Sequence, residues 1–208
     1  MLNVLLRRLV DALMARRWTR LLLLAAGVAL AATGVLSGAG PGTQAQAGAA
    51  GQDGKSYGLT GRVVRVADGD TFNLLVGGKQ ERVRLASIDA PEVTKDRERP
   101  GQPMAQASKD ALSALIGGKT LTLVCFERDR YERNICDVPL EGGMTANQKQ
   151  VQSGMAWANM EGRGKFMRDP KVRGLEQQAK DKGLGIWQRS DAVSPWAWRY
   201  QCWQKQQC

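Results

Sequence analysis

The chain has 208 residues, of which 30 are Lys or Arg, 20 are Asp or Glu, and none is His. The resulting net charge of +10 favours a polyanionic partner, namely nucleic acid, an anionic membrane or an acidic polysaccharide. The lack of histidine excludes an imidazole base, a histidine metal ligand and a serine–histidine pair. The length allows one folded domain with appendages.

Residues 1–47 have the layout of an export signal. Five arginines precede the apolar run Leu21–Leu36, and small residues follow up to an A-x-A motif that ends at Ala47. This order is typical of a secretory signal that is cleaved, so we expect a periplasmic or secreted protein. If the apolar run is extended to Gly40 it has 20 residues, which is enough for a retained signal anchor and attachment to a membrane.

The rest of the chain divides into three parts. Residues 48–58 are polar and glycine-rich and predict a flexible linker, residues 59–190 predict the folded domain, and residues 191–208 form a Trp- and Cys-rich tail. Alternating or apolar runs predict strands at 62–66, 71–76, 82–88, 121–126 and 135–140, and helical spacing predicts helices at 104–115, 144–153 and 170–182. This order predicts an α+β fold, a five-stranded OB-fold β-barrel with about three packed helices.

The four cysteines, Cys125, Cys136, Cys202 and Cys208, all follow the predicted signal. An even number of cysteines in an exported chain favours disulfides. The first two flank a hairpin-like turn and the last two lie in the tail, so we favour the pairs 125–136 and 202–208. A zinc site is disfavoured because the spacings contain no C-x2-C pair and no histidine can contribute.

Three short segments concentrate the ionisable residues. They are the turn Asp68–Asp70, the segment Arg84–Glu92 and the charged turn Asp129–Arg133. Taken singly, the first segment is most simply a turn, the second a strand end with an ion pair, and the third a solvated loop. Taken together, they could form one catalytic site.

The residue types of these segments suit phosphodiester chemistry. A hard cation such as Ca²⁺ needs several oxygen ligands, which Asp70, Asp89 and a main-chain carbonyl could supply. Glu92 could deprotonate a water molecule without any histidine. Arg84 and Arg133 could hold two phosphate oxygens and neutralise the charge that develops at phosphorus.

The segments Arg65–Thr71, Arg84–Glu92 and Asp129–Arg133 closely resemble the thermonuclease family, whose members are similar to staphylococcal nuclease. The resemblance runs from about Gly61 to Trp187. It implies a Ca²⁺-dependent nuclease that cuts DNA and RNA, with single strands preferred, to leave 3′-phosphate ends without an obligate protein partner. The site residues it implies are Asp70, Asp89 and the Ala90 carbonyl as metal ligands, Glu92 as general base, Arg84 and Arg133 as phosphate clamps, Asp68 near the metal, and Arg130 and Tyr131 as substrate contacts.

The sequence departs from this resemblance at a few positions. Glu132 stands where the family has glycine. No tyrosine matches the aromatic residues that stack on the substrate base, so Trp157 or Phe166 could take this role or belong to the core. The charged loop 94–101 has no evident role. The aromatic tail is either a stacking surface for single strands or, as we favour, a clasp that packs back on the barrel.

Two other functions compete with a nuclease. The chain could be a catalytically inactive OB-fold module that binds nucleic acid, or an envelope protein that holds acidic polysaccharide. A pure binding protein has no use for Asp70, Asp89 and Glu92 facing phosphates. The combination of carboxylates and arginines therefore favours the enzyme.

Overall fold

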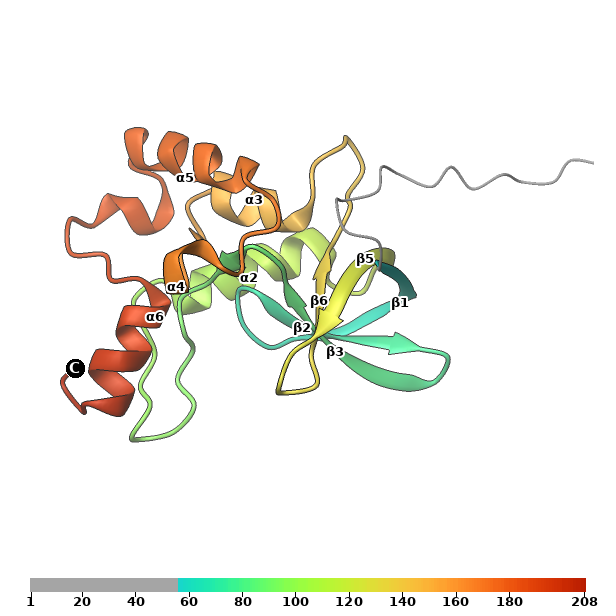
Figure 1. Cartoon of the computed structure of the whole chain (residues 1–208), viewed down its shortest axis with the longest axis horizontal. Helices are drawn as coiled ribbons and strands as arrows, with labels where there is room; N and C mark the ends of the chain where they lie inside the picture. Colours follow the sequence, from blue (N-terminus) through green and yellow to red (C-terminus); the bar gives the residue numbers. More distant parts are fainter. Residues whose placement is uncertain (1–55) are drawn as a thin grey trace, which may run out of the picture. The chain divides into compact units, whose positions relative to one another are not determined.

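The computed structural model describes residues 56–208, so the predicted signal or anchor and nearly all of the predicted linker lie outside the described residues. Five strands close into a barrel in the order β1 (Tyr57–Val66), β2 (Thr71–Val76), β3 (Lys79–Leu85), β6 (Asn134–Asp137) and β5 (Thr120–Arg128). Only the β3–β6 pair of this barrel is parallel. The predicted α+β class and OB-type barrel are confirmed (Figure 1).

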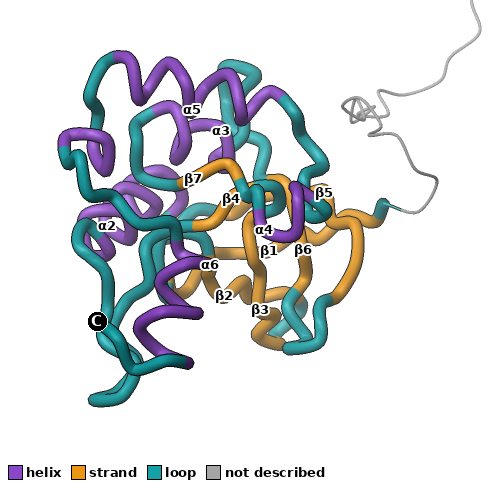
Figure 2. Tube along the Cα trace, turned by 60° about the vertical axis from the view of Figure 1, so that its left-hand side comes forward, coloured by secondary structure: helices purple, strands orange, loops and turns teal. Residues whose placement is uncertain are grey.

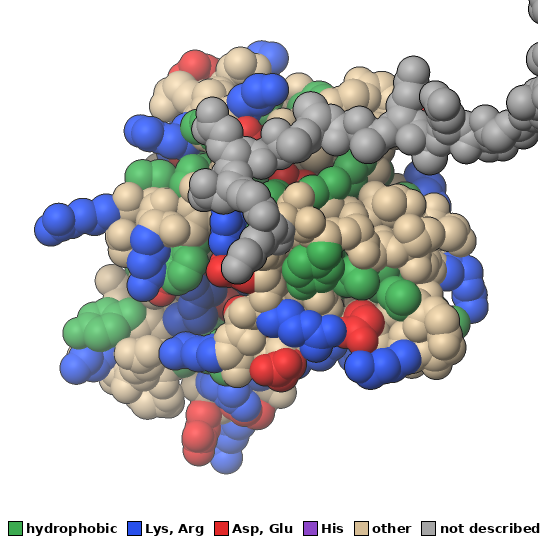
Figure 3. Space-filling model, turned by 45° about the vertical axis from the view of Figure 1, so that its right-hand side comes forward, with side chains coloured by type: hydrophobic (Ala, Val, Ile, Leu, Met, Phe, Trp, Pro, Cys, Tyr) green, Lys and Arg blue, Asp and Glu red, His purple; other side chains and the backbone are tan. Residues whose placement is uncertain are grey.

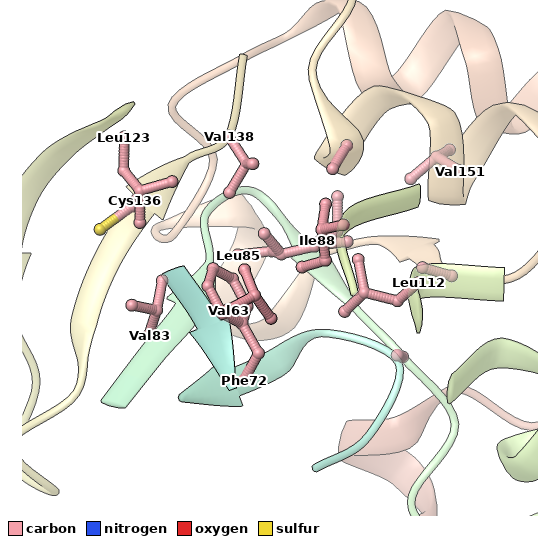
Figure 4. Close-up of a cluster of buried hydrophobic side chains, with 14 of the residues drawn as sticks. Val63, Phe72, Val83, Leu85, Ile88, Leu112, Leu123, Cys136, Val138 and Val151 are labelled. Carbon is pink, nitrogen blue, oxygen red and sulfur yellow. The ribbon is translucent and has the colours of Figure 1, made fainter. Parts of the chain in front are cut away.

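The alternation of apolar and polar residues decides which side chains fill the barrel. In β3, Val83 and Leu85 are buried, while Arg84 lies on the opposite face of the strand because successive side chains alternate. Figure 4 shows Val83 and Leu85 packed with Phe72, Leu112 and other apolar side chains. The same strand therefore supplies both core residues and an outward-facing arginine.

The strand predicted over 82–88 is interrupted. Strand β3 ends at Leu85, and Ser87 has a positive φ of 66°. The Ser87 hydroxyl accepts hydrogen bonds from the main-chain N–H groups of Arg168 and Asp169, both at 2.9 Å, which holds this turn. After it, β4 (Ile88–Asp89) pairs with β7 (Trp157–Ala158) in a separate two-stranded sheet. The turn thus carries Asp89 away from the barrel ladder.

The three predicted helices are present as α2 (Ala105–Ile116), α3 (Ala146–Gln152) and α5 (Lys171–Asp181). Helix α3 begins with a capping box, in which the Thr145 hydroxyl and the Gln148 side chain each accept a main-chain N–H of the other residue. Strand β7 and four short helical elements were not predicted; the latter are α4 (Glu161–Gly164), η1 (Gly185–Gln188), α6 (Pro195–Trp198) and η2 (Arg199–Gln204). No helix in the described part of the chain is long and apolar enough to cross a bilayer.

Both disulfides that the sequence favoured are present. Cys125–Cys136 joins β5 to β6 at paired positions, and Cys202–Cys208 closes the end of the tail. Disulfides persist mainly in oxidising compartments, so this pairing agrees with an exported protein.

Asn147 ties the strands to helix α3. Its side-chain amide donates to the carbonyls of Ala86 and Cys136 and to the Asp137 carboxylate, while its oxygen accepts the N–H of Val138. Burial raises the pKa of Asp137 to about 6, and the nearby Asp169 adds to the rise. The ionised form of Asp137 is therefore disfavoured in the folded protein.

We expect Asp137→Asn to stabilise the protein above pH 6. The ordinary aspartate pKa is about 3.9, so the folded protein binds the Asp137 proton more tightly than the unfolded chain does. Stability is therefore lost as pH rises from about 4 to about 6. The asparagine keeps the acceptor for Asn147 and should raise the free energy of unfolding at pH 7 by about 2 kcal/mol, with little change at pH 4.

Urea denaturation at both pH values would measure this difference. Asp110→Asn, at an exposed position on α2, is the matched control and should show no such pH-dependent gain. An equal gain for both variants would point to general charge reduction instead.

Candidate active site

A cleft of about 1190 Å³ collects the charged segments that the sequence singled out. The predicted site residues that line it are Asp68, Asp70, Arg84, Ala90, Glu92, Arg130, Tyr131 and Arg133. Asp89 is fully buried and does not line the cleft, but its carboxylate contacts Arg84 and Arg199, which do. Where Figure 3 shows the surface, Lys and Arg side chains alternate with Asp and Glu and do not form one basic patch.

Asp70 lies at the end of the turn between β1 and β2 and is 3% exposed. One carboxylate oxygen accepts from the Thr71 hydroxyl at 2.8 Å and from Arg84 at 2.9 Å, and the other accepts the N–H of Ala90 at 2.9 Å. Burial raises the pKa of Asp70 above its ordinary value, although Arg84 opposes the rise. A further positive charge at this position would therefore stabilise the carboxylate.

Gly69 allows this turn to lie against helix α2. A Cβ at this position would come within 1.8 Å of the Ser108 hydroxyl oxygen and 2.8 Å of the Ala90 Cβ. The buried Gln150 amide, on helix α3, joins the turn to α2 by donating to the carbonyls of Gly69 at 2.8 Å and Ser108 at 3.0 Å. The position of Asp70 is thus fixed by close packing and hydrogen bonds.

Arg84 joins the two buried aspartates. Its Nη1 lies 2.9 Å from Asp70 Oδ1 and its Nη2 lies 2.7 Å from Asp89 Oδ1. Burial alone would lower the pKa of Arg84, but the two carboxylates raise it above its ordinary value. The guanidinium is therefore permanently charged and oriented at the base of the cleft.

Arg199, from the C-terminal tail, is a second arginine at the same carboxylates. Its Nη2 lies 2.9 Å from Asp89 Oδ2, and its Nη1 lies 2.7 Å from Glu92 Oε1. Burial raises the pKa of Glu92, and the hydrogen bond from Arg199 opposes this rise. Arg199 is not among the site residues that the sequence predicts; there it stands only as the last residue of the Pro-Trp-x-x-Arg pattern in the Trp-rich tail.

The turn that carries Arg133 is organised by Asp129. One Asp129 oxygen accepts the main-chain N–H groups of Tyr131 and Arg133, and the other lies 2.6 Å from Arg133 Nη2. Burial alone would raise the pKa of Asp129, but its hydrogen bonds with Arg133 lower it below the ordinary value. Arg130 donates to the Tyr131 hydroxyl at 2.7 Å, and Tyr131 is 54% exposed at the cleft.

The donor groups at the base of the cleft suit a hard cation. Asp70 and Asp89 offer carboxylate oxygens, and the main chain of Ala90 adjoins Asp70. Within residues 56–208 no three acidic or cysteine side chains converge as a complete ligand set. A cation would therefore need main-chain and water oxygens in addition, which is usual for Ca²⁺.

Comparison with known proteins identifies the family. The profile described as staphylococcal nuclease homologue matches residues 82–189. The chain belongs to the staphylococcal nuclease family. This membership confirms the prediction of a hydrolase of the nuclease class.

Relatives of similar length support the assignment. The chain is 39% identical over 142 residues to a protein of Escherichia coli O157:H7 named uncharacterized endonuclease, an alignment that covers 68% of this chain and 86% of that protein. It is 36% identical over 143 residues to an uncharacterized endonuclease of Haemophilus influenzae, covering 68% and 74%. It is 38% identical over 147 residues to a protein of Shigella flexneri named micrococcal nuclease, covering 67% and 79%.

The two aromatic residues predicted as candidates for base stacking differ in exposure in this member of the staphylococcal nuclease family. Trp157 is buried and packs edge-on against Trp187, with ring centroids 5.3 Å apart, so it belongs to the core. Phe166 is exposed at the cleft and carries Lys165 over its ring. Of the two, only Phe166 can meet a base.

Glu132 adopts the backbone conformation that favours glycine. Its φ is 58°, and its side chain is 79% exposed with Arg128 as a distant partner at 3.7 Å. A non-glycine residue in this left-handed region costs about 1–2 kcal/mol. The departure from the family thus places both strain and negative charge beside Tyr131 and Arg133.

We expect Glu132→Gly and Glu132→Gln to separate these two effects. The glycine relieves the strained φ and should raise the free energy of unfolding by up to about 1 kcal/mol, a gain reduced by the greater entropy of the unfolded chain. The glutamine keeps the strain and should leave stability unchanged. Both remove a charge, so both should lower the KM for nucleic acid, more at low salt than at high salt.

Thermal unfolding and KM at two salt concentrations test this expectation. If the glutamine variant stabilises as much as the glycine variant, then charge, and not backbone conformation, governs this turn.

Proposed function

We propose that this staphylococcal nuclease family member is a Ca²⁺-dependent, sugar-nonspecific nuclease that hydrolyses DNA and RNA to leave 3′-phosphate ends. The observation that carries the proposal is that Asp70, Glu92 and several arginines from separate segments of the chain line one cleft, and that the buried Asp89 contacts two of these arginines. The printed names of the relatives, endonuclease and micrococcal nuclease, support the reaction class.

The metal would be held by Asp70, Asp89 and the Ala90 carbonyl, with Asp68 beside them. Asp68 accepts the main-chain N–H of Asp70 at 3.2 Å and so supports the turn. Bound Ca²⁺ would neutralise part of the charge on the phosphate oxygens. These assignments use residues that already share one network of hydrogen bonds.

The remaining roles follow from the chemistry of the side chains. Glu92 takes a proton from the attacking water, whose oxygen bonds to phosphorus as the bond from phosphorus to the 5′-oxygen breaks. The 5′-oxygen leaves with a proton from solvent, and the phosphate stays on the 3′ side. Arg84 and Arg133 donate hydrogen bonds to the phosphate oxygens, where negative charge develops.

The cleft is suited to a flexible strand. Its volume of about 1190 Å³ exceeds that of most small-molecule sites. Arg130 and Tyr131 would contact a neighbouring phosphate, and exposed aromatic rings can stack on unpaired bases, which favours single strands. The reaction requires no protein partner.

An exported nuclease would meet foreign or extracellular nucleic acid. The two disulfides and the signal-like residues 1–47 support a periplasmic or secreted location. Retention of that segment as an anchor would leave the nuclease domain attached to the membrane.

Glu92→Gln tests the proposed mechanism. With single-stranded DNA and the full-length chain, cleavage should require Ca²⁺, stop in chelator and fall by about 10²- to 10⁴-fold in the variant. Glu98→Gln, an exposed position in the same loop, should keep full activity. Mass spectrometry of the products should show 3′-phosphate ends.

Two results would contradict the proposal. Equal rates for Glu92→Gln and the native protein would remove Glu92 as the base. A folded protein that binds DNA without cleaving it in Ca²⁺ would instead be the inactive OB-fold binding module.

A further inference from the structure

The C-terminal tail lies outside the region that matches the family profile, yet it contributes a side chain to the site. The profile ends at residue 189, and Arg199 lies ten positions later as the first residue of η2, directly after α6. In Figures 1 and 2, α6 lies beside the loop that follows β4. This loop contains the charged residues 94–101 that had no evident role in the sequence.

Hydrogen bonds fasten the tail to that loop. The indole N–H groups of Trp198 and Trp203 both donate to the carbonyl of Pro100, at 3.0 and 2.9 Å. Near the end of the chain, the Gln206 amide donates to the Glu98 carbonyl at 3.2 Å, and the disulfide Cys202–Cys208 closes this end of the tail. The aromatic clasp predicted for the tail therefore exists, but its hydrogen bonds go to the loop and not to the barrel strands.

The same loop holds Glu92 in place. The main-chain N–H of Gln102 donates to the Glu92 carbonyl at 2.8 Å, and the Glu92 N–H donates to the Gln102 side chain at 3.0 Å. The Gln102 amide also donates to the Val193 carbonyl at 2.8 Å, just before the tail helices. Gln102 thus links the backbone of the predicted base directly to the tail.

Arg199 is the close partner of the Glu92 carboxylate. Glu92 Oε1 lies 2.7 Å from Arg199 Nη1, whereas Lys95 Nζ lies 3.8 Å from the other carboxylate oxygen. The Arg199 guanidinium also contacts Asp89, so it stands between two carboxylates of like charge. Without Arg199, the repulsion between the two carboxylates would drive the Glu92 side chain away from Asp89.

We propose that Arg199 is a positioning residue of the nuclease site, delivered by the C-terminal tail to hold the Glu92 carboxylate at a fixed place beside Asp89. The inference rests on the proposed function, because it takes Glu92 as the base. It gives the loop that contains residues 94–101 and the C-terminal tail one common role. The loop and the tail dock on each other so that Glu92 and Arg199 meet.

Arg199→Met and Arg199→Lys test the inference in the full-length chain, with Arg189→Met as the matched control. Arg189 lies in an exposed pair with Asp191. We expect Arg199→Met to lower kcat by about 10- to 100-fold with KM changed by less than about threefold, because misplacing a catalytic group by 1 Å can cost that much. Lysine should recover part of the rate, and the Arg189 variant should keep all of it.

A Ca²⁺ titration by calorimetry supplies a readout besides activity. Arg199→Met removes a positive charge next to Asp89, so Ca²⁺ should bind as tightly as in the native protein or more tightly. In the double variant Glu92→Gln/Arg199→Met, the rate should equal that of Glu92→Gln alone, because Arg199 acts through Glu92.

Several results would overturn the inference. If Arg199→Met cleaves as fast as the native protein or faster at low Ca²⁺, then Arg199 inhibits the reaction and does not assist it. If excess Ca²⁺ restores the rate of Arg199→Met, then Arg199 acts on metal binding. If the double variant is slower than Glu92→Gln alone, then Arg199 acts on the substrate and not through Glu92. Failure of the proposed function is distinguishable, because then either the native protein would not cleave DNA in Ca²⁺ or Glu92→Gln alone would keep the native rate.

Discussion

The buried Asp89 carboxylate is the constraint around which the site is arranged. A fully buried charge is stable only when it is paired and hydrogen-bonded. Asp89 meets this requirement with two arginines, Arg84 from barrel strand β3 and Arg199 from the tail. A single carboxylate thus couples the barrel to the C-terminal tail. Loss of either arginine would leave the buried negative charge of Asp89 with a single arginine partner, so the barrel and the C-terminal tail depend on each other.

The barrel contributes to this arrangement through elementary strand geometry. Alternation in β3 places Val83 and Leu85 in the core and Arg84 outside it. The turn at Ser87 then redirects the chain, so that Asp89 pairs with β7 and comes within reach of the same arginine. The seven residues 83–89 therefore combine a core-forming strand, a sharp turn and two oppositely charged groups that meet. The fold and the site cannot be separated in this segment.

Much of this architecture could be predicted from sequence, because local patterns determine it. The alternating strands, the helical spacing of α2 and the disulfide pairs each depend on neighbours close in the chain or on few alternatives. The break at Ser87 could not be predicted, since its cause is a contact with Arg168 and Asp169, some eighty residues away. Arg199 was missed for the same reason. Its close partners Asp89 and Glu92 lie more than a hundred residues earlier, and no spacing rule links them to Arg199.

The pairing of the arginines bears on how the cleft receives a phosphate. Arg84 contacts Asp70 and Asp89, Arg133 contacts Asp129, and Arg199 contacts Asp89 and Glu92. These carboxylates hold each guanidinium in one orientation before any substrate arrives, which lowers the cost of reorganisation during the reaction. A guanidinium has five N–H donors, so it can keep a carboxylate partner while it turns other donors to a phosphate oxygen. Glu92 differs from the other carboxylates because it must also remain free to accept a proton. An arginine that contacts one of its oxygens and leaves the other to the cleft satisfies both demands.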